Sequence, residues 1–146
     1  MACRQGHALV SRMLLDHGAA LDACDEKDEW TPLFEALHQA SDKHVEVIRI
    51  LLQGGATVNA VSRNGMQPIH LAAEGGHVGA LNFLLDHGQE HCSDDLSRAK
   101  TSHNRWEPLS FAAKEGNLGA VYALLEHGAE VGATNVGGTT ALHYAA

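Results

Sequence analysis

Histidine and cysteine are the residues best suited to chemistry in this chain, which has 11 histidines and 3 cysteines among its 146 residues. His91, Cys92 and His103 are grouped in one short stretch. Zinc needs three or four such ligands converging at short range, and a cysteine with a histidine could form a nucleophile and its base. Adjacent side chains such as those of His91 and Cys92 usually diverge, however, and no third orienting group is apparent. We therefore expect a solvated loop here.

All other histidines except His38 fall at recurring positions. One group directly precedes a glycine, where a donor side chain suits a helix C-terminus. A second group holds the fourth position of a recurring tetrapeptide, and a third marks the start of an apolar segment. In that order the groups are His17, His87 and His127; His70 and His143; and His7, His44 and His77. Motifs of known catalytic sites are also absent, so the sequence predicts no catalytic residue, cofactor or metal site.

Two patterns predict the elements that position these residues. In the first, an apolar segment begins after a small or polar mark and closes with a glycine eleven residues beyond that mark. It occurs from His7 to Gly18, His44 to Gly55, His77 to Gly88 and Asn117 to Gly128. The apolar side chains keep helical spacing, and a glycine after a helix lets the chain turn through positive φ. Each stretch therefore predicts a helix that ends before its glycine.

The second pattern is a tetrapeptide that contains all three prolines of the chain. Its copies begin at Thr31, Gln67, Glu107 and Thr140. Proline is tolerated in the first turn of a helix, and a preceding threonine can cap it, so each copy predicts the start of another helix. Gln67 and Glu107 should be poorer caps by about 1 kcal/mol each, and we expect Gln67→Thr and Glu107→Thr to stabilise the fold.

These patterns resemble the ankyrin repeat family, whose unit is about 33 residues of turn, helix and helix that begins Thr-Pro-Leu-His. The resemblance covers essentially the whole chain, and residues 55–60, Gly-Ala-Thr-Val-Asn-Ala, match the family's helix-end segment almost letter for letter. It implies an all-α fold, an ankyrin-repeat α-solenoid of stacked helix-turn-helix units with projecting finger loops. The expected units are a partial repeat 1–28, repeats 29–64, 65–104 and 105–137, and a partial repeat 138–146.

Two departures from the pattern are expected to matter. The second unit has three extra residues, which places an insertion near 40–43, between its two helices. The connection over 89–105 is seven residues longer than its counterpart and lacks the expected apolar residues, so it is either specialised or degraded. Both ends stop inside a unit, and solenoids normally finish in repeats with a polar outer face. We expect a fragment of a longer array.

Composition limits the class of partner. The net charge is −8, with no basic cluster interleaved with aromatic residues, which disfavours nucleic acid. No stretch is long enough to span a bilayer, the first residues do not resemble a signal peptide, and three irregularly spaced cysteines do not form a disulfide framework. We expect an intracellular protein, cytoplasmic or nuclear, that binds another protein and no membrane, nucleic acid or small-molecule substrate.

The expected contact residues lie in the fingers. The residue before each helix-start tetrapeptide is large and apolar in three of four units, namely Trp30, Met66 and Trp106, and this matches the family's variable contact position. Tryptophan is enriched in binding hot spots, although packing of both rings against neighbouring fingers is an equal alternative. The remaining predicted contact residues are Arg63, Asp28, Glu29, Asp94 and Asp95. Their acidic bias suits a basic partner, or it reflects solvation of the loop tips.

Three functions stay open. The first is a non-catalytic scaffold or adaptor that binds a protein through its fingers and concave face. In the second, the chain is the recognition or targeting array of a larger enzyme or signalling protein whose chemistry lies elsewhere. The third is a purely structural spacer, which predicts that the chain retains no partner.

Overall fold

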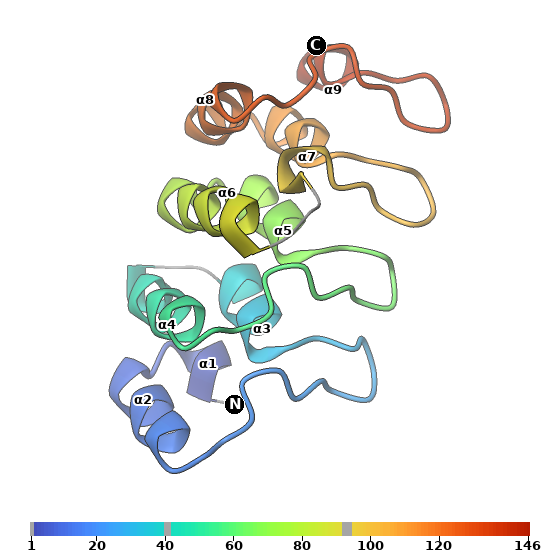
Figure 1. Cartoon of the computed structure of the whole chain (residues 1–146). Helices are drawn as coiled ribbons and strands as arrows, with labels where there is room; N and C mark the ends of the chain where they lie inside the picture. Colours follow the sequence, from blue (N-terminus) through green and yellow to red (C-terminus); the bar gives the residue numbers. More distant parts are fainter. Residues whose placement is uncertain (1, 40–41, 92–94) are drawn as a thin grey trace.

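The computed structural model describes residues 2–39, 42–91 and 95–146. It is a stack of helix pairs (Figure 1). The inner helices form the middle column: α1 (Ala2–Gln5), α3 (Pro32–Gln39), α5 (Pro68–Glu74), α7 (Pro108–Lys114) and α9 (Ala141–Ala145). The outer helices are α2 (Ala8–Asp16), α4 (Asp42–Gln53), α6 (Val78–His91) and α8 (Leu118–Glu126). A short 3-10 helix, η1 (Leu96–Arg98), follows α6. The predicted all-α solenoid of helix-turn-helix units with projecting loops is confirmed.

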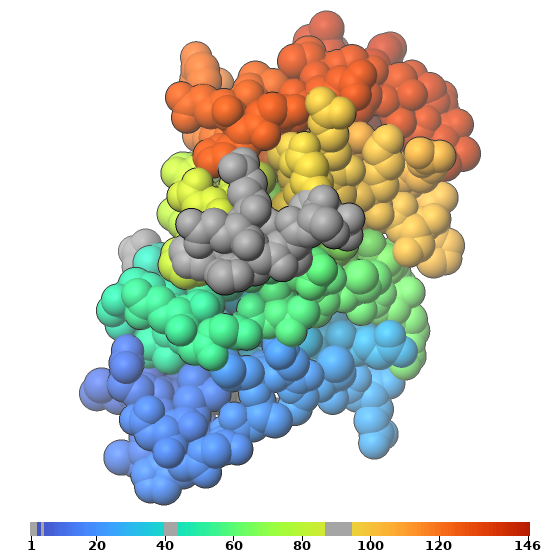
Figure 2. Space-filling model, in the orientation of Figure 1, coloured from blue at the N-terminus to red at the C-terminus, as the bar shows by residue number. Residues whose placement is uncertain are grey.

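Hairpin-like loops project from the stack on the side away from the outer helices (Figure 1). We call them finger 1 (residues 19–31), finger 2 (56–67), finger 3 (95–107) and finger 4 (129–140). The colours of the space-filling view run from blue to red along the stack, so each unit lies between its sequence neighbours (Figure 2). None of the described helices combines the length and apolar character needed to cross a bilayer.

The core is a thin layer of aliphatic side chains between successive units. Leu33, Phe34 and Leu37 of α3 are buried, and so are Ala72 and Ala112 of the next two inner helices. Alanine at these positions lets neighbouring inner helices approach closely, and burial of apolar surface is the main stabilising contribution. The sequence meets this need with small and aliphatic residues in place of a large aromatic core.

Glycine ends three outer helices in the predicted way. Gly18, Gly55 and Gly128 all have φ between 85° and 89°. In the first of these turns the Gly18 N–H donates to the Leu15 carbonyl at 2.9 Å and the Ala19 N–H to the Leu14 carbonyl at 3.0 Å. The same pair of bonds closes α4 and α8. It satisfies carbonyls that have no partner within the helix.

Gly88 departs from this pattern, and the prediction that it ends its helix is wrong: α6 continues to His91. In the other units an alanine follows the glycine, and two of these alanines, Ala56 and Ala129, are buried. Gln89 follows Gly88 instead, so this unit lacks the alanine that accompanies the turn in the other units.

The residue before the inner-helix start also departs from expectation. The prediction that Thr31 caps α3 is wrong, because its Oγ1 is buried without a hydrogen-bond partner among the described residues. In the last unit the Thr140 hydroxyl lies 2.7 Å from Nδ1 of His143. The corresponding residue in the earlier unit is Phe34, which is fully buried and has no polar atom to offer.

Glu107 holds the same position before α7 but has another role. Its side chain is only 4% exposed, and its Oε1 lies 3.1 Å from Lys100 Nζ. It makes no capping bond to the helix. Glu107 is therefore the buried half of an ion pair with the exposed Lys100, which revises the expectation that threonine would improve this position.

Candidate functional site

One arrangement of hydrogen bonds recurs in all four fingers. In each, a polar side chain in the loop accepts a hydrogen bond from the backbone N–H of the residue two positions before the inner helix. A second bond runs from the backbone N–H of that polar residue to the carbonyl of the same partner. The pairs are Asp25 with Trp30 (2.6 Å), Ser62 with Met66 (3.2 Å), Thr101 with Trp106 (3.0 Å) and Asn135 with Thr139 (2.9 Å). We call Trp30, Met66, Trp106 and Thr139 the anchor column.

Fingers 1 and 3 are one residue longer than fingers 2 and 4 between these paired positions. In the long fingers the residue before the tryptophan is Glu29 or Arg105, with φ of 57° and 54°. The short fingers have Gly65 and Gly138 there, with φ of 73° and 75°. Only glycine adopts such φ values without steric cost. The two tryptophans therefore sit in a matching, strained loop type that alternates with a relaxed one.

Trp30 is half-buried at the root of finger 1. Its ring stacks on Phe34 with centroids 6.1 Å apart and meets the edge of His38 at 4.9 Å. Beside it lies a hollow of about 460 Å³. The hollow is lined by Cys3, Ala23, Cys24, Asp25, Trp30, Pro32 and Glu35. The Trp30 N–H hydrogen bond lowers the pKa of the Asp25 carboxyl from its ordinary value, so this rim carries a negative charge at neutral pH.

Trp106 lies in a larger aromatic group. Its ring contacts Phe111 with centroids 5.2 Å apart and Tyr144, from the next inner helix, at 4.5 Å. The Tyr144 hydroxyl accepts a hydrogen bond from Asn135 Nδ2 at 2.8 Å, which holds the tyrosine in place. Both tryptophans therefore have ring contacts with inner helices. Each tryptophan ring is packed on one side and partly exposed on another.

Met66 and Trp106 line the same hollow, of about 390 Å³, between fingers 2 and 3. The lining residues are Asn64, Met66, Thr101, His103, Asn104, Trp106 and Phe111. An apolar floor with a polar rim is the usual form of a binding hollow. The sequence did not predict Phe111 as part of the site, because it looks like any other apolar residue of a helix. The amide side chains of the rim, Asn64 and Asn104, have no sequence signal of their own.

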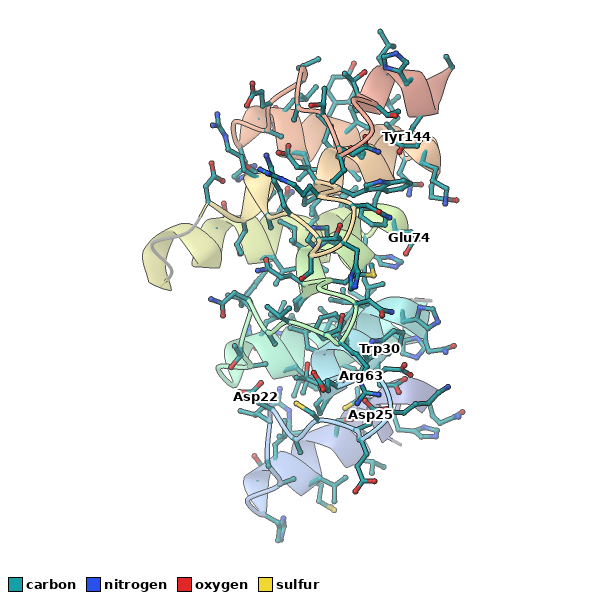
Figure 3. The ribbon with its side chains drawn as sticks, turned by 90° about the vertical axis from the view of Figure 1, so that its right-hand side faces the viewer. Asp22, Asp25, Trp30, Arg63, Glu74 and Tyr144 are labelled. Atoms are coloured by element: carbon teal, nitrogen blue, oxygen red, sulfur yellow. The ribbon has the colours of Figure 1, made fainter. Side chains whose placement is uncertain are left out.

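The predicted charged residues at the finger tips come together in part. The Arg63 side chain donates to the Glu26 carbonyl at 2.8 Å and reaches Glu29 Oε1 at 3.5 Å, and the Arg63 backbone N–H donates to the Asp28 carbonyl at 3.1 Å. Asp25, Trp30 and Arg63 lie near one another at the finger side of the stack (Figure 3). Arg63, Asp28 and Glu29 thus join fingers 1 and 2.

Asp95 lies apart from that group. Its Oδ1 accepts hydrogen bonds from the Ser97 N–H and hydroxyl at 3.0 and 2.6 Å, which caps η1. Its Oδ2 also lies 3.5 Å from Arg98. The side chain is therefore engaged within its own segment. Asp94 is outside the described residues.

The structural roles predicted for several histidines are confirmed. Nδ1 of His17 and of His127 donates to a carbonyl of the last helical turn at 2.8 Å. His70 accepts from the Gln67 N–H at 3.0 Å and reaches the Ala99 carbonyl at 3.1 Å, and burial lowers its pKa. In the part of the chain that the structure describes, no three metal-ligating side chains converge. Cys92 and the His91 side chain lie outside that part.

The comparisons with known proteins agree with this architecture. A family model described as ankyrin repeats (3 copies) matches residues 1–95 and 91–146. Ankyrin repeat and SOCS box protein 3 of Bos taurus is 32% identical over 93 residues, which cover 62% of this chain and 17% of that protein. Putative ankyrin repeat protein YahD of Escherichia coli is 30% identical over 89 residues, 60% of this chain and 44% of that protein. L-asparaginase of Dirofilaria immitis is 37% identical over 51 residues, 35% of this chain and 9% of the enzyme.

Proposed function

Because the chain belongs to the ankyrin repeat family, whose repeats are generally non-catalytic protein-interaction modules, we propose that it is a scaffold or adaptor that binds one protein through its fingers and concave face. The anchor column is the proposed contact site. Catalysis by its own residues forms no part of this proposal.

The observation that carries the proposal is the setting of the two tryptophans. Each ring is supported on one side by aromatic residues, Phe34 for Trp30 and Phe111 for Trp106, and borders a hollow on another. A supported, partly exposed tryptophan loses little conformational entropy on binding and removes much apolar surface from water. Such rings are suited to be hot spots.

The charged residues favour a basic partner. Finger 1 has five carboxylates and one lysine, a formal net charge of −4. Arg63, Asp28 and Glu29 form its junction with finger 2, and we propose that they contact the partner together with Asp94 and Asp95. We also propose that binding occurs inside the cell, which suits the exposed free thiol of Cys24.

One observation favours the second candidate function, a recognition array within a larger protein. The chain spans only 17% of the length of the bovine relative and 9% of a relative named as an enzyme, L-asparaginase. In that case the same anchor column would serve targeting or sensing, and the chemistry would lie in another part of the protein.

Affinity capture with matched variants tests the proposal. Wild type and Trp30→Ala/Trp106→Ala are compared with Leu118→Ala/Tyr122→Ala, which removes two side chains exposed by 66% and 62% on α8, away from the fingers. We expect a protein that wild type and the α8 variant retain and the tryptophan variant loses. Equal retention by all three would contradict the proposed site, and no retained protein would support a structural spacer.

A further inference from the structure

The fingers repeat with a period of two units. Fingers 1 and 3 are the long, tryptophan-bearing ones, and each joins the following short finger through one backbone hydrogen bond. The Arg63 N–H donates to the Asp28 carbonyl and the Val136 N–H to the Asn104 carbonyl, both at 3.1 Å. The tips of the two finger pairs therefore share this backbone contact, and the side chains beside it can be compared position by position.

These side chains differ in charge. The residue before the tryptophan is acidic in the first half, Glu29, and basic in the second, Arg105. Because their backbone angles match, φ 57° and 54°, the two charges occupy equivalent places beside Trp30 and Trp106. A partner that fits both tryptophans thus meets opposite charges at equivalent positions.

The surroundings preserve this opposition. In finger 1, Lys27 reaches Asp28 at 3.8 Å and Arg63 reaches Glu29 at 3.5 Å, which leaves the remaining carboxylates in excess. In finger 3, Arg98 and Lys100 are paired with Asp95 and Glu107. Arg105 makes no ion pair with any residue that the structure describes. Finger 1 is therefore negative next to its tryptophan, and finger 3 is positive next to its own.

We propose that the charge of the binding surface changes sign along the stack, from negative at finger 1 to positive at finger 3. The partner presents one extended segment whose basic end lies beside Trp30 and whose acidic end lies beside Arg105. This inference rests on the proposed function and adds the chemistry and direction of the partner. Helix layers are about 10 Å apart, so Trp30 and Trp106, which are two units apart, are separated by roughly 20 Å. About six extended residues span this distance. Charge complementarity of this kind sets orientation more than affinity.

The test begins with selection of binders. A displayed library of random peptides of about 16 residues, which reach roughly 50 Å when extended, is selected on the full chain and then screened on Trp30→Ala/Trp106→Ala. We expect the tryptophan-dependent peptides to carry lysine or arginine at one end and aspartate or glutamate at the other. Peptides that bind regardless of the tryptophans would contradict the proposed function itself.

Direction is then read by photo-crosslinking. A selected peptide carries a benzophenone at its basic or at its acidic end, and mass spectrometry locates the labelled residues. We expect the basic end to label finger 1 and the acidic end finger 3. In Glu29→Arg/Arg105→Glu, which keeps the net charge of the chain, the formal charge of finger 1 changes from −4 to −2 and that of finger 3 from +1 to −1. The preference of each peptide end for its finger should therefore weaken. A second swap, Arg12→Glu/Glu126→Arg on the outer helices, should leave the wild-type labelling unchanged, and thermal melts establish that each variant is folded.

The outcomes separate the two ideas. Tryptophan-dependent peptides that lack opposite charged ends, that label both fingers equally, or whose labelling is unchanged by the Glu29/Arg105 swap would overturn the proposed direction and leave the protein-binding surface standing. A weaker end preference in the swap, with unchanged labelling in the outer-helix control, would establish the proposed direction.

Discussion

Glu29 and Arg105 adopt the same left-handed backbone conformation, each one residue before a tryptophan and two units apart. A residue with a Cβ in this region costs roughly 1–2 kcal/mol, and such strain persists only where surrounding contacts over-determine it. Here the paired hydrogen bonds between Asp25 and Trp30, and between Thr101 and Trp106, close each loop. The strain is thus located next to the proposed contact residues.

Relief of this strain should stabilise the protein. We expect Arg105→Gly to raise the free energy of unfolding by roughly 0.5–1 kcal/mol, the steric gain less the extra chain entropy of glycine. Glu29→Gly should gain less, because it also loses the contact with Arg63. Urea unfolding followed by circular dichroism measures both, and a loss of stability in Arg105→Gly would contradict the strain.

Contact between fingers 2 and 3 should be sensitive to a single methyl group. A Cβ on Gly65 would overlap the side chain and backbone nitrogen of Ser102, whereas one on Gly138 would meet no atom within 4 Å. Both glycines have positive φ. We therefore expect Gly138→Ala to cost about 1 kcal/mol and Gly65→Ala about 3 kcal/mol or more. Equal losses in the two unfolding curves would mean that the fingers do not pack in this way.

Gln67 and Glu107 hold equivalent positions before α5 and α7, but their stability should respond differently to replacement by threonine. Gln67→Thr should stabilise α5 by about 1 kcal/mol, because His70 lies where His143 lies relative to Thr140. Glu107→Thr should destabilise, because it removes the partner of Lys100. Thermal melts of the two variants compare them directly. A gain in both would show that the Lys100 pair contributes little.

Stability should fall in mild acid. Burial lowers the pKa of His77 below its ordinary value of 6.5, with a smaller lowering from nearby His44 and an opposing hydrogen bond to the Leu37 carbonyl. The unfolded chain then binds more protons, so the stability present above about pH 6.5 is lost as the pH falls towards the folded pKa. Burial of His70 acts in the same direction. His127, whose pKa is raised, first by the Ala123 carbonyl and then by Asp86, acts oppositely and loses its contribution as the pH rises.

The chain offers a matched variant for this effect. Asn117 holds the equivalent place in the next unit and donates to the Ala73 and Glu74 carbonyls at 3.1 and 2.6 Å. We expect His77→Asn to keep a bond to the preceding inner helix and to lose part of the fall in stability between about pH 7.5 and pH 5.5. Unfolding curves at both pH values provide the readout, and an unchanged pH dependence would exclude His77 as a source.

Regular features of the fold were predictable because they follow from local rules. Pro68 and Pro108 begin helices where proline lacks only an unused N–H, and Gly18 and Gly128 turn through a positive φ that glycine adopts without strain. Gly88 shows the limit of such a rule. Glycine permits the turn but does not by itself end the helix, since α6 continues past Gly88 to His91.

The position of the candidate site could be predicted from the sequence, but its loop geometry and side-chain contacts could not. Trp30 and Trp106 stand out because a large apolar residue is unusual at an exposed loop root. The alternation of long and short fingers was missed, because it depends on side-chain-to-backbone bonds that leave no hydrophobic periodicity. Tyr144 illustrates the same difficulty, since it joins the Trp106 group from a different unit.

Binding of a protein by the anchor column is measured by the dissociation constant of the captured partner. It should be measured by titration calorimetry for wild type, Trp30→Ala/Trp106→Ala and the folded control Leu118→Ala/Tyr122→Ala. Loss of a hot-spot tryptophan typically costs about 2 kcal/mol, or roughly 30-fold in affinity. We predict at least that weakening in the tryptophan variant and wild-type affinity in the control, whereas equal affinity in all three proteins would contradict the account.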